Sequence, residues 1–321
     1  MQKYFNYTLN KLADKYKIKS ILVAISGGQD SICLIKLLES FDKLYNLYKI
    51  EYIYIDHQWR IDSKKQIQHI ISYMKVFKKK IYIYQINQLN SSEHVSRKHR
   101  YHIIINHAAI NRHEAIVTAH TKTDKLETFL LNLTRGTSLE GATSLSFHRK
   151  LNYNLNLFRP LISTSREDIT FFCKKRFLPL WSDTTNYNYE IKRNRIRHEI
   201  LPYLRKYLNN RYASHFIKFL KTCHYDNEYI KQKVNKLYIY LRSDYYISIN
   251  FYLLKKEPFS IQARMLQLFI YHNFHLVANK KTLLKIIKYI NTNNKEYRAA
   301  DINNAINIRL CQNWMYVILK I

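Results

Sequence analysis

Two short segments in the first half of the chain carry residue types that bind phosphate groups. The first is Ser26–Ser31, which reads S-G-G-Q-D-S and lies between an apolar run and a segment with helical spacing. Backbone N–H groups at the start of a helix bind anions, and glycine lets a phosphate approach the backbone closely. The carboxylate of Asp30 would repel a bare phosphate, so we expect Mg²⁺ to bridge the two. The segment predicts a nucleotide site formed by Ser26, Gly27, Gly28, Gln29, Asp30 and Ser31.

The second segment, Thr118–Thr128, begins at the end of an apolar run and continues with helical spacing. Asp124 and Glu127 are three residues apart, so they share one face of the helix. His120 suits contact with a phosphate or an adenylate, and a structural histidine is the alternative. A solvated helix face is the alternative for the two carboxylates. Arg135-Gly136 closes the same helix and is predicted to contribute to the nucleotide site.

Four arginines are spaced as pairs on two predicted helices: Arg97 and Arg100, and Arg193 and Arg197. Guanidinium groups bind phosphate oxygens bidentately and stabilise charge that develops on them in a transition state. Solvent-exposed helix charges are the alternative reading. If the four act on a nucleotide, the fold must bring both helices to the segments around Asp30 and His120.

The elements that would position these residues alternate between strands and helices. Short apolar runs predict parallel strands, and the intervening segments predict helices, so we expect a doubly wound, mostly parallel α/β sheet. Ligands bind such sheets at the carboxyl ends of the strands, where Ser26–Ser31, Asp56-His57 and Thr118–His120 all fall. The predicted strands are Ser20–Ile25, Glu51–Asp56, Ile81–Ile86 and Ala115–Ala119, and the predicted helices are Asp62–Phe77 and Glu93–Arg112.

The second half of the chain has a different pattern. Ser165 is expected to cap a helix, and beyond Pro202 the spacing becomes helical and more basic. We therefore predict a catalytic domain over residues 1–205 and a smaller, mainly helical, basic domain over 206–321. Helices are expected at Tyr203–Tyr240, Ser260–His272 and Lys280–Ile290, before a β-rich tail from Ile306 to Ile321.

Composition narrows the possible partners. The 321 residues include 53 Lys and Arg against 23 Asp and Glu, a net charge of +30, which favours a nucleic-acid partner. An AT-rich genome, which would also explain 28 Tyr and only 4 Gly, is the alternative source of the lysines. No run of about 18 apolar residues is present, so no membrane partner is expected. The four cysteines are scattered and the histidines of residues 94–113 lie around their helix, so neither a zinc nor a redox site is expected.

The motifs together resemble a known family. The S-G-G-x-D-S segment after the first strand is similar to the PP-loop of ATP pyrophosphatases, which cleave ATP between its α and β phosphates. Thr118–Thr128 resembles the T-A-H-H-x-D-D-Q-x-E-T motif of tRNA(Ile)-lysidine synthetases but has Thr121, Thr123 and Lys125 at three of its positions. Further similar elements, in chain order, are Asp56–Arg60, Ser96–Tyr101, Arg159–Leu161, Asp183–Asn186 and Arg193–Pro202.

The resemblance implies an ATP- and Mg²⁺-dependent ligase. Such an enzyme adenylates the C2 carbonyl oxygen of the first anticodon cytidine of a tRNA(Ile) with a CAU anticodon and then couples free L-lysine to the C2 carbon. It implies catalytic roles for Asp30, Glu127, His120, Arg97 and Arg193. Asp56, His57, Arg135 and Gly136 would join the PP-loop in binding ATP, with Asp30 as the metal ligand. Arg100, Asp124, Asn194 and Arg197 would bind the substrates.

Two other functions fit parts of the pattern: another PP-loop enzyme such as a tRNA thiolase, and a non-catalytic RNA-binding protein with a decayed ATP site. The absence of paired cysteines and the intact PP-loop argue against them. The composition, the Asp56–Arg60 element and an N-terminus without a transit-peptide pattern predict a plastid-encoded protein of the stroma, with a bacterial cytoplasm as the alternative. No DNA partner is expected.

Overall fold

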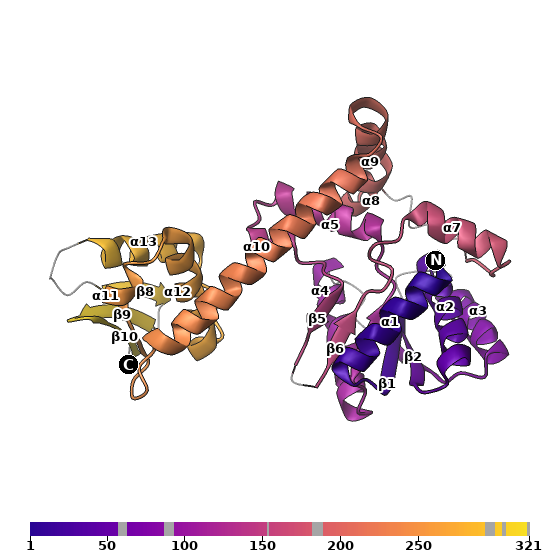
Figure 1. Cartoon of the computed structure of the whole chain (residues 1–321), viewed down its shortest axis with the longest axis horizontal. Coiled ribbons are helices and arrows are strands. Elements are labelled where there is room, and N and C mark those ends of the chain that lie inside the picture. The colour runs from indigo at the N-terminus through magenta and orange to yellow at the C-terminus, as the bar shows by residue number, and fades with distance from the viewer. Residues whose placement is uncertain are drawn as a thin grey trace. The chain divides into compact units, whose positions relative to one another are not determined.

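The computed structural model describes residues 1–56, 63–86, 93–152, 154–181, 189–292, 299–303 and 306–319. The chain packs as two compact units, Met1–Leu220 and Lys221–Ile321, and each is described by itself (Figure 1). The predicted division at residue 205 into a catalytic and a tRNA-binding domain stays a prediction.

A six-stranded sheet forms the centre of the first unit (Figure 1). Its strand order is β3-β2-β1-β4-β6-β5, and every neighbouring pair is parallel except β5 and β6. The doubly wound, mostly parallel sheet predicted from the sequence is therefore confirmed. The strands are β1 (Ser20–Ile25), β2 (Lys49–Asp56), β3 (Ile81–Gln85), β4 (Ala115–Thr118), β5 (His148–Lys150) and β6 (Asn156–Phe158).

Apolar side chains of the strands pack into cores on both faces of this sheet. Val23 joins the core cluster that includes Leu34 and Ile70, whereas its neighbour Leu22 joins the cluster that includes Ile104. Successive residues of a strand point to opposite faces, so a strand buried on both sides needs an unbroken apolar run. The helices are α1 (Gln2–Tyr16), α2 (Gln29–Tyr45), α3 (Ser63–Val76), α4 (Glu93–Ile110), α5 (Lys122–Thr134), α6 (Leu139–Ala142) and α7 (Arg166–Lys175).

A helical stretch with π-helical turns follows α7. It consists of α8 (Lys192–Arg195), the π-helical η2 (Ile196–Ile200), α9 (Leu201–Tyr203) and the π-helical η3 (Leu204–Leu208). Pro202 cannot donate a backbone hydrogen bond, and in a regular α-helix its ring would clash with the carbonyl of His198. We attribute the wider turn before it to this proline. Ile196 and Leu201 pack against Leu126, which fixes this stretch to α5.

The long helix α10 (Tyr212–Leu241) precedes the elements of the second unit. These are β7 (Ser248–Asn250), α11 (Phe251–Leu254), α12 (Phe259–Phe274), α13 (Lys280–Asn291), β8 (Ala299–Asn303), β9 (Ile306–Cys311) and β10 (Trp314–Leu319). The helices predicted here are confirmed, and the β-rich tail contributes β9 and β10 to an antiparallel sheet of order β7-β10-β9-β8. Within the ranges described, no helix is long and apolar enough to cross a bilayer.

Candidate active site

A cavity of about 220 Å³ opens at the carboxyl ends of β1, β2 and β4. Its position is the one expected for a ligand site on a doubly wound sheet. It contains residues from two of the predicted polar segments, Ser26–Ser31 and Thr118–His120. Its polar lining consists of Ser26, Asp30, Ser31, Arg100, Tyr101, Thr118, His120, Asp124 and Arg193.

In the loop between β1 and α2, the backbone conformation and the packing require glycine at one position, Gly27. Gly27 has φ +76°, and a Cβ at this position would lie 2.7 Å from Cδ1 of Ile70. Gly28 has an extended backbone with φ −77°, and a Cβ there would meet only Oγ of Ser26, at 3.8 Å. The fold would therefore accept a side chain at Gly28, and its glycine leaves the backbone open to the close approach of a ligand.

The two serines of the loop are hydrogen-bonded to each other. The Oγ atoms of Ser26 and Ser31 lie 2.9 Å apart, and the Ser26 N–H donates to Oγ of Ser31 at 3.0 Å. Gln29 points away from the cavity, because its Nε2 donates to Oγ1 of Thr170 in α7 at 2.7 Å. The structure therefore places Ser26, Asp30 and Ser31 at the cavity and gives Gln29 a role in holding α7.

Asp30 has the features of a cation ligand. Its Oδ1 is buried and has no hydrogen-bond partner. Burial raises the pKa of Asp30 to about 6, and the positive charge of Arg166 opposes this rise. A buried carboxylate oxygen without a donor fits a Mg²⁺ ion, which takes one or two protein carboxylates and completes its shell with water and phosphate oxygens. Among the described residues no group of three potential ligands is present, so the protein would hold such an ion together with the nucleotide.

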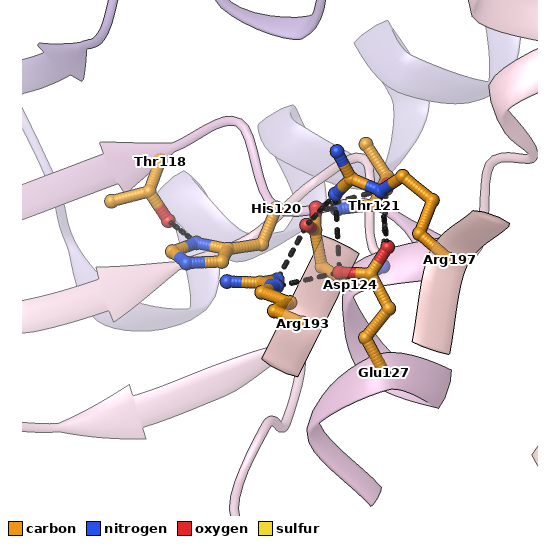
Figure 2. A network of polar contacts seen from close by, with 7 residues as sticks. All are labelled: Thr118, His120, Thr121, Asp124, Glu127, Arg193 and Arg197. Atoms are coloured by element: carbon orange, nitrogen blue, oxygen red, sulfur yellow. Dashed lines mark hydrogen bonds and ion pairs between the residues drawn. The ribbon is translucent and has the colours of Figure 1, made fainter. Parts of the chain in front are cut away.

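Two arginines and two carboxylates form a compact cluster beside the cavity (Figure 2). Glu127 accepts from Nε of Arg193 at 2.5 Å, from Nε of Arg197 at 2.6 Å and from Nη2 of Arg197 at 3.1 Å. Asp124 accepts from Nη2 of Arg193 at 2.6 Å and lies 3.8 Å from Nη2 of Arg197. We call Asp124, Glu127, Arg193 and Arg197 the four-charge cluster. It joins the first turns of α5 to α8 and η2, and its charges sum to zero.

Glu127 lies deepest in this cluster, with no exposed surface. The two guanidinium groups occupy both of its oxygens, so its carboxylate holds Arg193 and Arg197 in place. Asp124 also caps α5, because it accepts from the N–H and the Oγ1 of Thr121 at 2.7 and 2.9 Å. Burial would raise the pKa of Asp124, but Arg193 and the Thr121 hydrogen bonds hold it below its usual value. Thr121 thus supplies a helix cap where the resembling motif has a second histidine.

His120 is electrically neutral at physiological pH. Its Nδ1 lies 2.8 Å from Oγ1 of Thr118 (Figure 2). Burial lowers the pKa of His120 to about 3; the charge of Asp124 opposes this shift, and nearby arginines add to it. The ring can therefore exchange a hydrogen bond with a ligand but brings no positive charge to it.

Helix α4 contributes Arg100 and Tyr101 directly to the cavity lining. Arg97 lies one turn earlier, with its Cζ 5.9 Å from the centre of the Tyr101 ring. Arg159 is buried and donates from Nη1 to the backbone oxygen of Ser146 at 2.8 Å. Sequence analysis selected Arg97 and Arg100 but gave no site role to Tyr101 or Arg159. The only sequence signal for these two was their place in motifs of the resembling family.

Several predicted site residues lie away from the cavity. Arg135 is exposed and ends α5, and this helix of 13 residues carries it and Gly136 about 20 Å from the cavity end. Asn194 and Asp56 are buried and do not line the cavity. His57 lies outside the described residues. The binding roles predicted for these residues stay predictions, and for Arg135 and Gly136 the geometry gives them no support.

Comparisons with known proteins agree with this arrangement. A family model described as a PP-loop domain matches residues 1–204. A protein of Gracilaria tenuistipitata var. liui named tRNA(Ile)-lysidine synthase, chloroplastic, is 44% identical, over 98% of this chain and 99% of its own. A protein of the same name from Pyropia yezoensis is 37% identical, over 85% of this chain and 82% of its own.

One solved structure supports the fold alone. It is the U34-tRNA thiolase NcsA of Methanococcus maripaludis with its [4Fe-4S] cluster. It superposes with a TM-score of 0.54 at 14% identity, over 68% of this chain and 78% of its own.

Proposed function

The chain belongs to the family of tRNA(Ile)-lysidine synthases, ligases that form a carbon–nitrogen bond, and from this premise we propose how its site performs such a ligation. ATP would bind in the cavity between the PP-loop and α4. The tRNA would present a cytidine, the first base of a CAU anticodon. Free L-lysine would supply the amine. The observation that carries the proposal is the buried, partner-free Oδ1 of Asp30 in a cavity lined by Arg100 and Arg193.

In the first step, the C2 carbonyl oxygen of the cytidine attacks the α-phosphate of ATP. The bond from the α-phosphorus to the bridging oxygen breaks, and its electron pair leaves with pyrophosphate. Negative charge grows on the α-phosphate during the attack, and guanidinium groups at its position stabilise that charge. Arg193 suits this role because Glu127 and Asp124 hold its side chain beside the cavity. A Mg²⁺ ion held at Asp30 would neutralise charge on the phosphates.

In the second step, the ε-amine of lysine attacks the activated C2 carbon, the bond from C2 to the adenylate oxygen breaks, and its electron pair leaves with AMP. An ammonium ion is not a nucleophile, so a base must first take its proton. Glu127 does not suit this task, because both of its oxygens bind arginines. Asp30 does, since its Oδ1 lies in the cavity without a hydrogen-bond partner. We therefore assign Glu127 to positioning the arginines and proton acceptance to Asp30 once pyrophosphate has left.

The second half of the chain is proposed to hold the tRNA. The net charge of +30 supports a polyanion partner, and basic side chains that contact phosphates make affinity strongly dependent on salt. We assign this role to residues 206–321. The chloroplastic relatives point to the plastid, and we propose the stroma as the place of action, which fractionation of isolated plastids would test.

The direct test incubates the purified protein with ATP, Mg²⁺, labelled lysine and a CAU-anticodon tRNA(Ile) transcript. We expect lysine to be incorporated with equal release of AMP and pyrophosphate, and no incorporation when the first anticodon base is not cytidine. Transfer of sulfur in place of lysine would establish the thiolase alternative. Tight tRNA binding without any ATP-dependent product would refute the proposal in favour of a binding protein.

A further inference from the structure

The first unit has a second cavity, of about 610 Å³, between α7 and the start of α1. Figure 1 shows the N-terminal end of α1 beside α7. The α7 residues that line the cavity recur three and four positions apart, so they share one face of the helix. The aromatic and charged part of the lining consists of Tyr4, Asp168, Phe171, Phe172, Lys175 and Arg176. None of these residues lines the active-site cavity.

Two hydrogen bonds place this second cavity next to the candidate active site. The backbone oxygen of Thr164, which lines the second cavity, accepts from the N–H of Lys122 at 3.0 Å. Lys122 begins α5, and the same first turn of α5 brings Asp124 to the active-site cavity. On the other face of α7, Thr170 accepts from Gln29 of the PP-loop at 2.7 Å. The second cavity therefore lies about the width of one helix, roughly 10–12 Å, from the PP-loop.

The second cavity offers aromatic side chains with open surfaces. Tyr4 is 59% exposed and Phe171 is 67% exposed, whereas Phe172 packs against the core of the unit. Exposed apolar groups that gather in one place mark a binding site, which single scattered ones do not. Rings of this kind bind unpaired nucleic-acid bases, because every base has a flat face that stacks on them.

Basic side chains accompany the aromatic ones. Lys175 and Arg176 form no ion pair with any residue that the structure describes, and Cζ of Arg176 lies 6.0 Å from the centre of the Phe172 ring. Of the described residues in the lining, Asp168 alone is acidic, and it accepts from Oγ of Ser165 at 2.6 Å. The two cations complement the phosphates of a nucleic-acid strand, whereas an apolar peptide would cover them without a counter-ion.

We propose that the second cavity binds an unpaired base of the tRNA anticodon loop while the target cytidine occupies the active-site cavity. The inference rests on the proposed function and adds an RNA-binding surface to it. The base stacks on Phe171 and Tyr4, and Lys175 and Arg176 contact the phosphates beside it. A second base held close to the cytidine restricts the movement of the cytidine and orients it for attack on ATP.

The test compares Phe171→Ala with the control Tyr7→Ala in the full-length protein. Tyr7 is 63% exposed on the same helix as Tyr4 but does not line the cavity. Filter binding uses the intact CAU-anticodon tRNA(Ile) and tRNAs in which each unpaired base of the anticodon loop in turn is replaced by an abasic site. We expect Phe171→Ala to weaken binding of the intact tRNA by about fivefold to a hundredfold, and Tyr7→Ala to change it by less than about twofold.

The abasic tRNAs identify the base that stacks on the ring. One of them should bind the unaltered protein more weakly and lose little further affinity with Phe171→Ala, because the base and the ring form the same contact. Phe171→Tyr keeps a ring and should bind the intact tRNA normally. Lys175→Gln should flatten the slope of log affinity against log salt concentration by about 0.7 units, the value for one contact to a single strand, and Phe171→Ala should leave that slope unchanged.

The outcomes separate this inference from the function on which it rests. If Phe171→Ala weakens binding of the intact tRNA and of every abasic tRNA equally, the cavity binds another part of the tRNA and the inference is overturned. Unchanged affinity in Phe171→Ala would also overturn it, in favour of another partner such as a peptide. In either case the unaltered protein would still form lysidine. Failure of the unaltered protein to modify tRNA would instead refute the proposed function.

Discussion

Replacing Glu127 with glutamine tests whether the four-charge cluster is held together by a buried charge. The substitution keeps the shape of the side chain but removes its charge, leaving two guanidinium groups with only Asp124 as counter-ion. Glu127 is 0% exposed, and the side chains of Arg193 and Arg197 are 22% and 17% exposed. Removing one partner of a buried ion pair costs about 3–5 kcal/mol. Because the arginines retain some solvent, we expect a loss near the lower bound, about 3 kcal/mol in the free energy of unfolding.

The matched control is Glu167→Gln. Glu167 pairs with Arg205 at 3.1 Å, with side-chain exposures of 71% and 64%. Exposed pairs of this kind contribute about 0.2–1 kcal/mol. The same chemical change is thus made once inside the protein and once at its surface.

Urea unfolding followed by circular dichroism measures both variants. With a slope of about 2 kcal/mol per molar urea, a loss of 3 kcal/mol lowers the midpoint by about 1.5 M for Glu127→Gln. The Glu167→Gln midpoint should move by less than about 0.5 M. Equal midpoints for the two variants would refute the reasoning, because they would show that burial adds nothing to the value of the cluster.

Four further predictions follow from the same geometry. Asp30→Ala should abolish AMP formation while circular dichroism and tRNA filter binding stay unchanged, and near-normal AMP formation would remove Asp30 from the phosphate–metal site. Gly27→Ala should lower the melting temperature because its backbone is left-handed, whereas Gly28→Ala should melt normally and lose only ATP affinity in calorimetry. The pKa of His120 is about 3 in the folded protein and 6.5 in the unfolded chain, so between these pH values the unfolded chain binds more protons. The stability of the protein therefore falls as the pH falls through this window. His120→Gln should make the melting temperature less dependent on pH there. A chain ending at residue 220 should still bind ATP. If it has lost three phosphate contacts, the slope of log tRNA affinity against log salt concentration should flatten by about 2–3 units. An unchanged slope would mean that the first unit alone recognises the tRNA.

The parts of the fold that sequence predicted are those with strong local signals. Ser20–Ile25 is an unbroken apolar run followed by two glycines, and the structure has a strand with these same bounds. The strands β5 and β6 were not predicted, because each has three residues and its place depends on pairing, of β6 with β4 and of β5 with β6. Helix α1 was not predicted either, although its buried residues Phe5, Leu9 and Ala13 recur with the four-residue spacing of a helix.

In the candidate site, too, short-range sequence patterns could be predicted and contacts between distant parts of the chain could not. The PP-loop and the face shared by Asp124 and Glu127 were visible as short-range patterns. Their binding to the arginines was not, because Arg193 lies 66 residues from Glu127 in the chain and only the fold brings them together. Arg135-Gly136 is the opposite case, since it is close in sequence to Asp124 but lies at the far end of α5 from the cavity, and its predicted binding role stays a prediction.

The four-charge cluster also limits how this sequence can change over time. An arginine codon becomes a lysine codon by a single base change, and an AT-rich genome favours that change. At Arg193 a lysine would offer one point charge where the planar fork binds two different carboxylates at once. A charge lost on either helix would leave an unmatched charge in the interior until a second mutation restored the balance. Drift towards lysine can therefore proceed freely over the exposed surface, while these four positions can change only in coordinated steps.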